Sequence, residues 1–132
     1  MLKKSAAAVA TGVGAIAGVG LVSATPQPAF ADSPIYDNGG GGGCQAQWLS
    51  GPDDFRIRDL HDDGNHCYVN YGQTDAEVQE SRYRVSHRNG PAAGWDQYDA
   101  NVKGWRHIQF RVCENIGGGP DQCSSITGRF AL

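Results

Sequence analysis

Apolar and polar residues alternate along several short stretches of this chain. In the run DFRIR, Phe55 and Ile57 lie on one side of an extended backbone, and the arginines between and after them lie on the other. The same period of two recurs in HCYVNY at 66–71, SRYRVSHR at 81–88 and RHIQFRVC at 106–113. Half-buried antiparallel strands produce this alternation, so each run is expected to form a strand.

Turn-forming residues separate these runs. Glycine, proline, asparagine and aspartate cluster at 62–65, 88–94, 102–105 and 117–122. No long stretch has the 3.6-residue period of a helix, and residues 74–81 are expected to make one helical turn at most. Short strands at regular spacing predict an all-β fold, a small antiparallel β-sandwich of Ig-like or jelly-roll-like type.

The first 31 residues have the layout of a secretory signal peptide. Two lysines at 3–4 provide the charged start, an apolar run follows at 5–22, and Ala-Phe-Ala at 29–31 provides the cleavage signal. We expect cleavage between Ala31 and Asp32 and a secreted, extracellular product. Glycines interrupt the apolar run, and no other segment is apolar for the roughly 18 residues of a membrane span, so no membrane partner is expected.

The predicted mature chain divides into an arm and a domain. Residues 32–43 have little core-forming content and end in the glycines 39–43, so we expect a flexible N-terminal arm. Residues 44–132 are expected to form the sandwich. Loss of the two lysines at 3–4 takes the formal net charge from −3 to −5. Nucleic acid is not expected as a partner of so acidic a chain, because its phosphates need a basic face.

Four cysteines, an even number in a short exported chain, predict two disulfides. Three pairings are possible. Cys113 lies opposite to the apolar residues of its run, and Cys123 does the same on the next expected strand. Both then point outward from neighbouring strands, which favours the pair Cys113–Cys123 and leaves Cys44 to pair with Cys67. A zinc site is disfavoured because no C-x-x-C motif occurs.

The motif HDDGNH at 61–66 is the most enzyme-like patch, since His and Asp side chains can bind metal ions. Asp-Gly and Gly-Asn are also common in hairpin turns, and the strands on both sides favour a turn. The run lacks the ligand ladder and the distal Glu of a calcium loop. Neither a G-x-S-x-G motif nor a free cysteine is expected to supply a nucleophile. We therefore expect no metal, no cofactor and no catalytic residue, and thus not an enzyme.

Two other binding functions remain open. The aromatic residues could stack on sugars, as in a carbohydrate-binding module, although large rings are more often core residues of a small sandwich. A disulfide-closed β domain is also a common body for a secreted protease inhibitor. Its exposed loop would be ENIGGGPDQ at 114–122, but three consecutive glycines oppose the rigidity that inhibition requires.

The expected arm combines an apolar peptide with a flexible spacer. Its candidate contact residues come ahead of the glycines and are Pro34, Ile35, Tyr36, Asp37 and Asn38, with Ile35 and Tyr36 as anchors. An extended peptide of this kind suits strand addition or insertion into a cleft of a partner. Because a tether raises the local concentration of a second contact, arm and domain could together hold two surfaces. This arrangement predicts a non-catalytic adaptor that binds secreted proteins.

Three segments resemble small secreted β-sandwich proteins of filamentous, streptomycete-type actinobacteria. They are MLKKSAAAVATG at the start, DDGNHCYVNY at 62–71 and, above all, IQFRVCENIGGGPDQCSS at 108–125, and the Ala-Phe-Ala cleavage signal at 29–31 carries the same resemblance. In size, export and N-terminal extension the chain is also similar to the adaptor subunits of umbrella toxin particles. In that family the adaptor joins a lectin-like, trypsin-fold subunit to the repeats of a large toxin. The resemblance implies that residues 33–38 enter a cleft of the trypsin-fold partner and that the sandwich grips the toxin.

Overall fold

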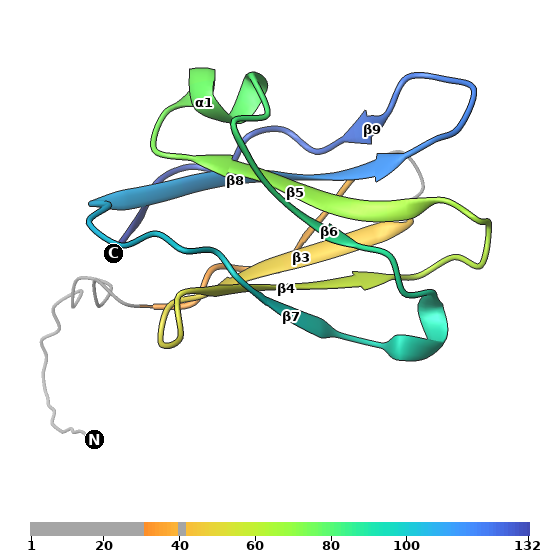
Figure 1. Cartoon of the computed structure of the whole chain (residues 1–132), viewed down its shortest axis with the longest axis horizontal. Coiled ribbons are helices and arrows are strands. Elements are labelled where there is room, and N and C mark those ends of the chain that lie inside the picture. Colours follow the sequence, from red (N-terminus) through yellow and green to blue (C-terminus); the bar gives the residue numbers. More distant parts are fainter. Residues whose placement is uncertain (1–30, 40–41) are drawn as a thin grey trace, which may run out of the picture.

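The computed structural model describes residues 31–39 and 42–132, and the signal peptide predicted at 1–31 lies outside these residues except for Ala31. The described chain folds into two antiparallel sheets that lie face to face, as Figure 1 shows. The all-β sandwich that the alternating pattern predicts is therefore confirmed. Within the described residues, no helix has the length and apolar character needed to cross a membrane.

Each sheet combines strands that are not consecutive in the chain. One sheet has four strands in the order β2-β3-β4-β7, with bounds Tyr36–Asp37, Cys44–Leu49, Asp54–Asp59 and Asp96–Asp99. The other has five: the order is β10-β8-β5-β6, with β9 also paired to β8. Their bounds are Phe130–Ala131, His107–Asn115, His66–Gly72, Tyr83–His87 and Gln122–Cys123. The chain changes sheet between β4 and β5, between β6 and β7 through the short 3₁₀ helix η1 (Pro91–Ala93), and again between β7 and β8.

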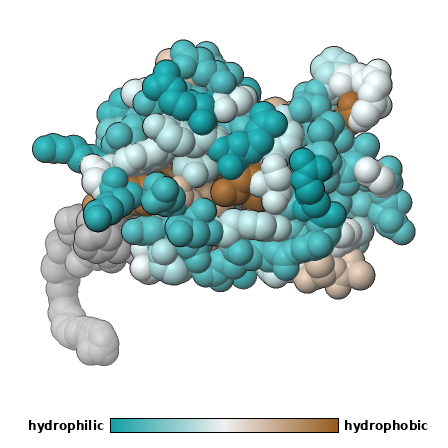
Figure 2. Space-filling model, viewed as in Figure 1, coloured by the Kyte–Doolittle hydropathy of each residue, from teal (hydrophilic) through white to brown (hydrophobic). Residues whose placement is uncertain are grey.

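The core lies between the sheets and is made from the apolar positions of the alternating runs. Phe55 and Ile57 of β4 are fully buried, as the pattern predicts. The Phe55 ring lies 5.0 Å from the ring of Trp48 and 5.0 Å from that of Phe110, measured between centroids. In Figure 2 the surface is mainly hydrophilic, and hydrophobic residues show through between the two layers. Large aromatic rings thus supply much of the apolar burial of this small domain.

Both predicted disulfides are present. Cys44–Cys67 joins β3 of one sheet to β5 of the other, and both of its residues are fully buried. Cys113 and Cys123 lie opposite each other on β8 and β9 and close the base of the loop between these strands. The first bridge therefore ties the two sheets together, whereas the second joins neighbouring strands.

The strand expected around Cys123 is interrupted in the middle. Two short pieces, β9 and β10, replace one strand, and the chain between them follows β8. Side-chain hydroxyls take over part of the pairing, because Val112 N donates to Ser124 Oγ at 3.1 Å. In the same way Phe110 N donates to Thr127 Oγ1 at 3.1 Å. Alternation could not show this, since it reports which side is buried and not which atom accepts the hydrogen bond.

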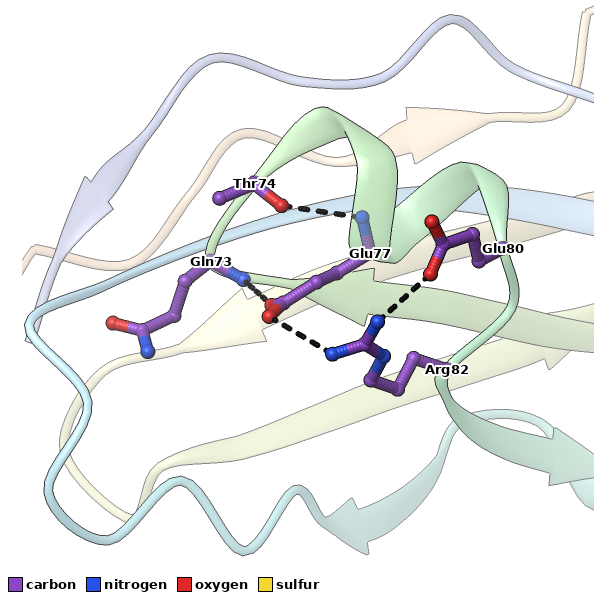
Figure 3. A network of polar contacts seen from close by, with 5 residues as sticks. All are labelled: Gln73, Thr74, Glu77, Glu80 and Arg82. Carbon is purple, nitrogen blue, oxygen red and sulfur yellow. Dashed lines mark hydrogen bonds and ion pairs between the residues drawn. The ribbon is translucent and has the colours of Figure 1, made fainter.

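One short helix, α1 (Asp75–Gln79), follows β5, in agreement with the single helical turn expected there. Thr74 caps the helix by accepting a hydrogen bond from Glu77 N at 3.2 Å. The Glu77 carboxylate reaches back to accept one from Gln73 N at 2.8 Å, an arrangement close to a capping box. Glu77 also faces Arg82, as Figure 3 shows. The charged groups of these two residues are 3.7 Å apart. This network holds the turn that leads into β6.

The N-terminal segment is not a free arm over its described residues. Its strand β2 pairs with β3 at the edge of the four-stranded sheet. The Tyr36 ring lies edge-on to that of Phe110 at 5.4 Å, and 6.5 Å from that of Phe130. The expectation of a flexible arm is therefore corrected for residues 32–39, and residues 40–41 lie outside the described chain. A two-residue strand carries no alternation to detect, so only the packing of its ring reveals it.

Candidate functional site

The five candidate contact residues of the N-terminal segment divide into two groups. Pro34, Ile35 and Asp37 are exposed, and Ile35 has 47% of its surface accessible. Tyr36 packs against the core, and Asn38 is 2% exposed. Pro34, Ile35 and Asp37 are therefore available to a partner, whereas Tyr36 and Asn38 are part of the folded domain.

Asn38 anchors the segment to the sandwich. Its side-chain oxygen accepts a hydrogen bond from Cys44 N at 3.1 Å. Its side-chain nitrogen donates to Glu114 Oε1 and to the carbonyl oxygen of Gln122, both at 3.4 Å. At the other end of the segment, Ser33 exchanges hydrogen bonds with β3. Bonds at both ends thus hold the segment in the sheet.

The exposed residues of the segment belong to a larger polar surface on the outer side of the four-stranded sheet. Ile35 and Asp37 alternate with the inward Tyr36, so they face outward with the outward residues of β3 and β4. We call this surface the arginine–tryptophan face, and it consists of Ile35, Asp37, Gln45, Gln47, Arg56, Arg58 and Trp95.

Two arginines and one tryptophan form the centre of this face. The guanidinium carbon of Arg56 lies 4.3 Å from the centre of the Trp95 ring, and that of Arg58 lies 4.6 Å from it. Nε of each arginine also donates to a glutamine of β3, at 2.7 Å from Arg56 to Gln47 and at 2.9 Å from Arg58 to Gln45. Stacking and hydrogen bonding together hold both guanidiniums in place.

The arginines of this face form no ion pair with a carboxylate in the part of the chain that the structure describes. Ion pairs there involve Arg82 and His87, and neither Arg56 nor Arg58 is paired with a carboxylate. Their terminal nitrogens make no hydrogen bond to the described residues. Two adjacent positive groups with free donors are suited to an anionic ligand, above all a carboxylate.

The sequence indicated only part of this face. The alternation in DFRIR shows that Arg56 and Arg58 share one side of a strand. Trp95 follows η1, far along the chain, and reaches the arginines because β7 pairs with β4, where Arg56 lies opposite Gln97. No local pattern predicts that register.

The HDDGNH motif lies in the turn between β4 and β5 and lines an open hollow of about 210 Å³. Gly64 adopts a positive φ of 77°, and Asn65 N donates to Asp63 Oδ1 at 3.0 Å, as expected for a tight turn. The loop after β6 lines the other side of the hollow with Arg88 and Asn89. Within residues 31–39 and 42–132, no three His, Cys, Asp or Glu residues are grouped so as to hold a metal ion.

The loop considered for protease inhibition is shorter than the sequence suggested, because β8 continues to Asn115. The remainder is a tight turn in which Gly119 N donates to the carbonyl oxygen of Ile116 at 3.3 Å. Ile116 N in turn donates to Asp121 Oδ1 at 3.3 Å. Residues 117–120, which are exposed, are three glycines and a proline, so the turn presents few side chains to a protease.

Glu114 is a buried carboxyl group, 6% exposed, near the end of β8. It lies against Gly43, where an added Cβ would come within 2.9 Å of Oε1. Burial raises the pKa of Glu114, and the neighbouring Asp63 carboxyl raises this pKa further. The pKa of Asp63 is lowered, chiefly by the hydrogen bond that its carboxylate accepts from Asn65 N. The pair links the β4–β5 turn to β8.

Replacing Glu114 by glutamine should make stability less dependent on pH. A raised pKa means that the folded protein holds the Glu114 proton more tightly than the unfolded chain does. This group therefore stabilises the fold below its ordinary pKa of 4.5, and the contribution is lost as pH rises through the raised pKa. Glutamine stays neutral throughout. In urea unfolding we expect wild type to lose stability relative to E114Q as pH rises above the ordinary pKa of 4.5.

Asp63→Asn is the comparison for this experiment. The lowered pKa of Asp63 gives a contribution that is present above 3.8 and is lost as pH falls, which is the opposite sign. A difference in unfolding free energy between wild type and E114Q that does not change with pH would contradict the shifted pKa of Glu114.

Comparison of this chain with protein-family models, with curated proteins and with solved structures found no match. Function is therefore inferred from the surfaces of the fold, in which the arginine–tryptophan face stands out by its preorganised and unpaired charges.

Proposed function

We propose that this protein is a secreted, non-catalytic adaptor that binds an acidic surface of a protein partner through its arginine–tryptophan face, within an extracellular complex. The two disulfides support a place outside the cytosol, because cysteines pair in oxidising compartments. The export signal predicted at 1–31 supports the same location. The resemblance to umbrella toxin adaptors makes the trypsin-fold and toxin subunits of such a particle the first partners to test.

The observation that carries this proposal is the pair of arginines that stack on Trp95 without an acidic partner in the described chain. Tryptophan and arginine are enriched at the energetic centres of protein interfaces. A guanidinium group also matches a carboxylate with two parallel hydrogen bonds. A sheet face with these groups at its centre suits a protein surface that carries Asp or Glu.

The donors of this face are ordered before a partner arrives. Gln45 and Gln47 hold Nε of the two arginines, and the tryptophan ring supports their planes. Ordering a flexible side chain at an interface costs about 0.5–1.5 kcal/mol, and here much of that ordering is already present. Less of the binding energy from the carboxylate contacts is therefore lost to ordering these side chains, and the affinity is higher.

The N-terminal segment contributes to this face through Ile35. The Tyr36 ring belongs to the core, whereas Ile35 is exposed on the outer side of the sheet. An exposed isoleucine beside charged residues provides an apolar contact next to the polar centre. Insertion of residues 33–38 into a cleft, which the resemblance implies, would require the segment to leave the sheet. We therefore assign the segment to one edge of the binding face.

Replacing Arg56 and Arg58 together by glutamine is expected to abolish capture of the partner. Wild-type and variant chains 32–132 would serve as baits in culture fluid of the organism that makes the protein, and captured proteins would be quantified by mass spectrometry. A hydrogen bond to a charged group contributes on the order of 1.5–3 kcal/mol, so losing two should weaken binding about 100-fold or more.

The matched control removes the same charge elsewhere. Arg106→Gln combined with Arg129→Gln changes two exposed arginines outside the face, and it should capture the partner as well as wild type does. Thermal unfolding establishes that both variants are folded. Equal capture by the Arg56/Arg58 variant, or no specific partner of the wild-type chain, would refute the proposal.

A further inference from the structure

We infer that the outer face of the five-stranded sheet is a second binding surface, which takes the carboxylates of an acidic protein segment between Arg84 and Arg111. The two sheets form separate layers in Figure 1, so their outer faces point away from each other. The biological role of this second surface rests on the proposed adaptor function, because an adaptor with two binding faces can hold two partners. Its evidence comes from different residues.

Three residues form a row across this sheet. Asn70 of β5 lies opposite Arg84 of β6 on one side and opposite Arg111 of β8 on the other. The neighbours Val69 and Val112 are buried in the core, so the row faces outward. Directly opposed residues on antiparallel strands have Cα atoms about 4.5–5.5 Å apart, which places the two arginines about 10 Å apart at the backbone. Both guanidiniums can therefore reach one ligand above Asn70.

Arg84 is held in position from two sides. Its guanidinium carbon lies 4.0 Å from the centre of the Tyr68 ring, and its Nε donates to Asn70 Oδ1 at 2.9 Å. Asn70 is 1% exposed and donates in turn to Ser81 Oγ at 3.0 Å. The terminal nitrogens of Arg84 make no hydrogen bond to the described residues, and the side chain is exposed. This repeats the design of the arginine–tryptophan face on the opposite side of the sandwich.

Arg111 carries a buried donor without a partner. Its Nε is inaccessible to solvent and makes no hydrogen bond to the residues that the structure describes. A small movement of the guanidinium toward a carboxylate would give this nitrogen an acceptor, which favours the bound state, because an unsatisfied buried donor is unfavourable.

The nearby carboxylate of Asp121 does not neutralise these arginines. It accepts hydrogen bonds from the Tyr68 hydroxyl at 2.5 Å and from Ile116 N at 3.3 Å. It forms no ion pair with Arg84 or Arg111, whose charges stay unpaired within the described chain. The surface thus has two unpaired guanidinium groups, and the Asp121 carboxylate beside them is hydrogen-bonded to other groups.

A carboxylate-bearing protein segment fits this surface better than a polyphosphate does. A guanidinium fork matches a carboxylate in shape. Nucleic acid would need a continuous basic face, whereas this chain has a formal net charge of −3 and the four arginines of the two proposed surfaces form two separate pairs.

NMR of arginine side chains tests the second surface directly. The Nε–H signals of nitrogen-15-labelled protein would be followed while the capped peptide acetyl-Glu-Glu-Glu-Glu-amide is added. The signals of Arg84 and Arg111 are expected to shift together and to saturate. Arg84→Gln, a change at an exposed position, should weaken the binding by about tenfold. Arg84→Lys keeps the charge without the fork and should restore only part of the affinity.

The same spectra separate the two proposals, because Arg56 and Arg58 report on the other face. If the Nε–H signals of Arg84 and Arg111 shift and saturate while those of Arg56 and Arg58 do not change, the result would support the second surface and count against the proposed function. A response of the first pair alone would overturn the second surface. Sodium sulfate and sodium phosphate at equal ionic strength are the competing probes, and shifts as large as those with the peptide would overturn the carboxylate assignment.

Discussion

Replacing Tyr36 by alanine is expected to destabilise the protein by about 2–3 kcal/mol, because the change leaves a cavity at the edge of the sandwich. The ring lies 5.4 Å from that of Phe110 and 6.5 Å from that of Phe130, so Tyr36 of the four-stranded sheet packs against two rings of the five-stranded sheet. Truncation of a fully buried aromatic ring costs about 3–5 kcal/mol, and the half-buried position of Tyr36 lowers the expected value. Urea unfolding followed by tryptophan fluorescence would measure the loss.

Two changes in the same strand region are matched controls. Tyr36→Phe keeps the ring, and the Tyr36 hydroxyl makes no hydrogen bond to the described residues, so stability should stay within about 0.5 kcal/mol of wild type. Ile35→Ala lies on the exposed side and should be equally mild. Wild-type stability in the Tyr36→Ala variant would mean that residues 32–39 leave the sheet in solution, and an inserted arm would then become the better explanation of function.

Removing the Cys44–Cys67 disulfide is expected to cost about 3 kcal/mol, the value of the chain-entropy model for a sequence separation of 23. This bridge joins β3 to β5 and so ties one sheet to the other, close to the point where the N-terminal segment enters. Replacing both cysteines by alanine should lower Tm by about 10–25 °C, since each kcal/mol shifts Tm by about 4–8 °C in a domain of this size.

The Cys113–Cys123 bridge is the internal comparison for this experiment. It closes a sequence separation of 10 between strands that already pair, so its removal should cost less. Calorimetric scans of the two double-alanine variants would show which disulfide contributes more to Tm. A Cys44/Cys67 variant that melts within about 3 °C of wild type would show that the sheets hold together without the bridge.

Much of the fold could be predicted because its signals are local. Along β4, β5, β6 and β8, the residues that alternation assigned to the inner face are buried or partly buried against the core. The pair Cys113–Cys123 followed from the same parity, and the remaining pair followed from it. A period of two records which side of a single strand is buried, and this needs no knowledge of the partner strand.

The candidate site was predictable only in part. Ile35 was expected as a contact residue and is exposed, whereas Tyr36 was expected beside it and is packed in the core. Arg56 and Arg58 were visible as an outward pair, but their support by Trp95 was not. Each missing contact joins residues that are far apart in the chain, where no periodic pattern connects them.

The sequence by itself determined the class of the fold, the buried side of its main strands and the pairing of its cysteines. Only the tertiary structure decided that Tyr36 closes the sandwich, that Trp95 supports Arg56 and Arg58, and that Glu114 meets Asp63. The physical reason is that burial of one strand face depends on its own residues, whereas these contacts depend on register and on how the two sheets meet. Side chains that are far apart in the chain can form such contacts only after the two sheets have packed together.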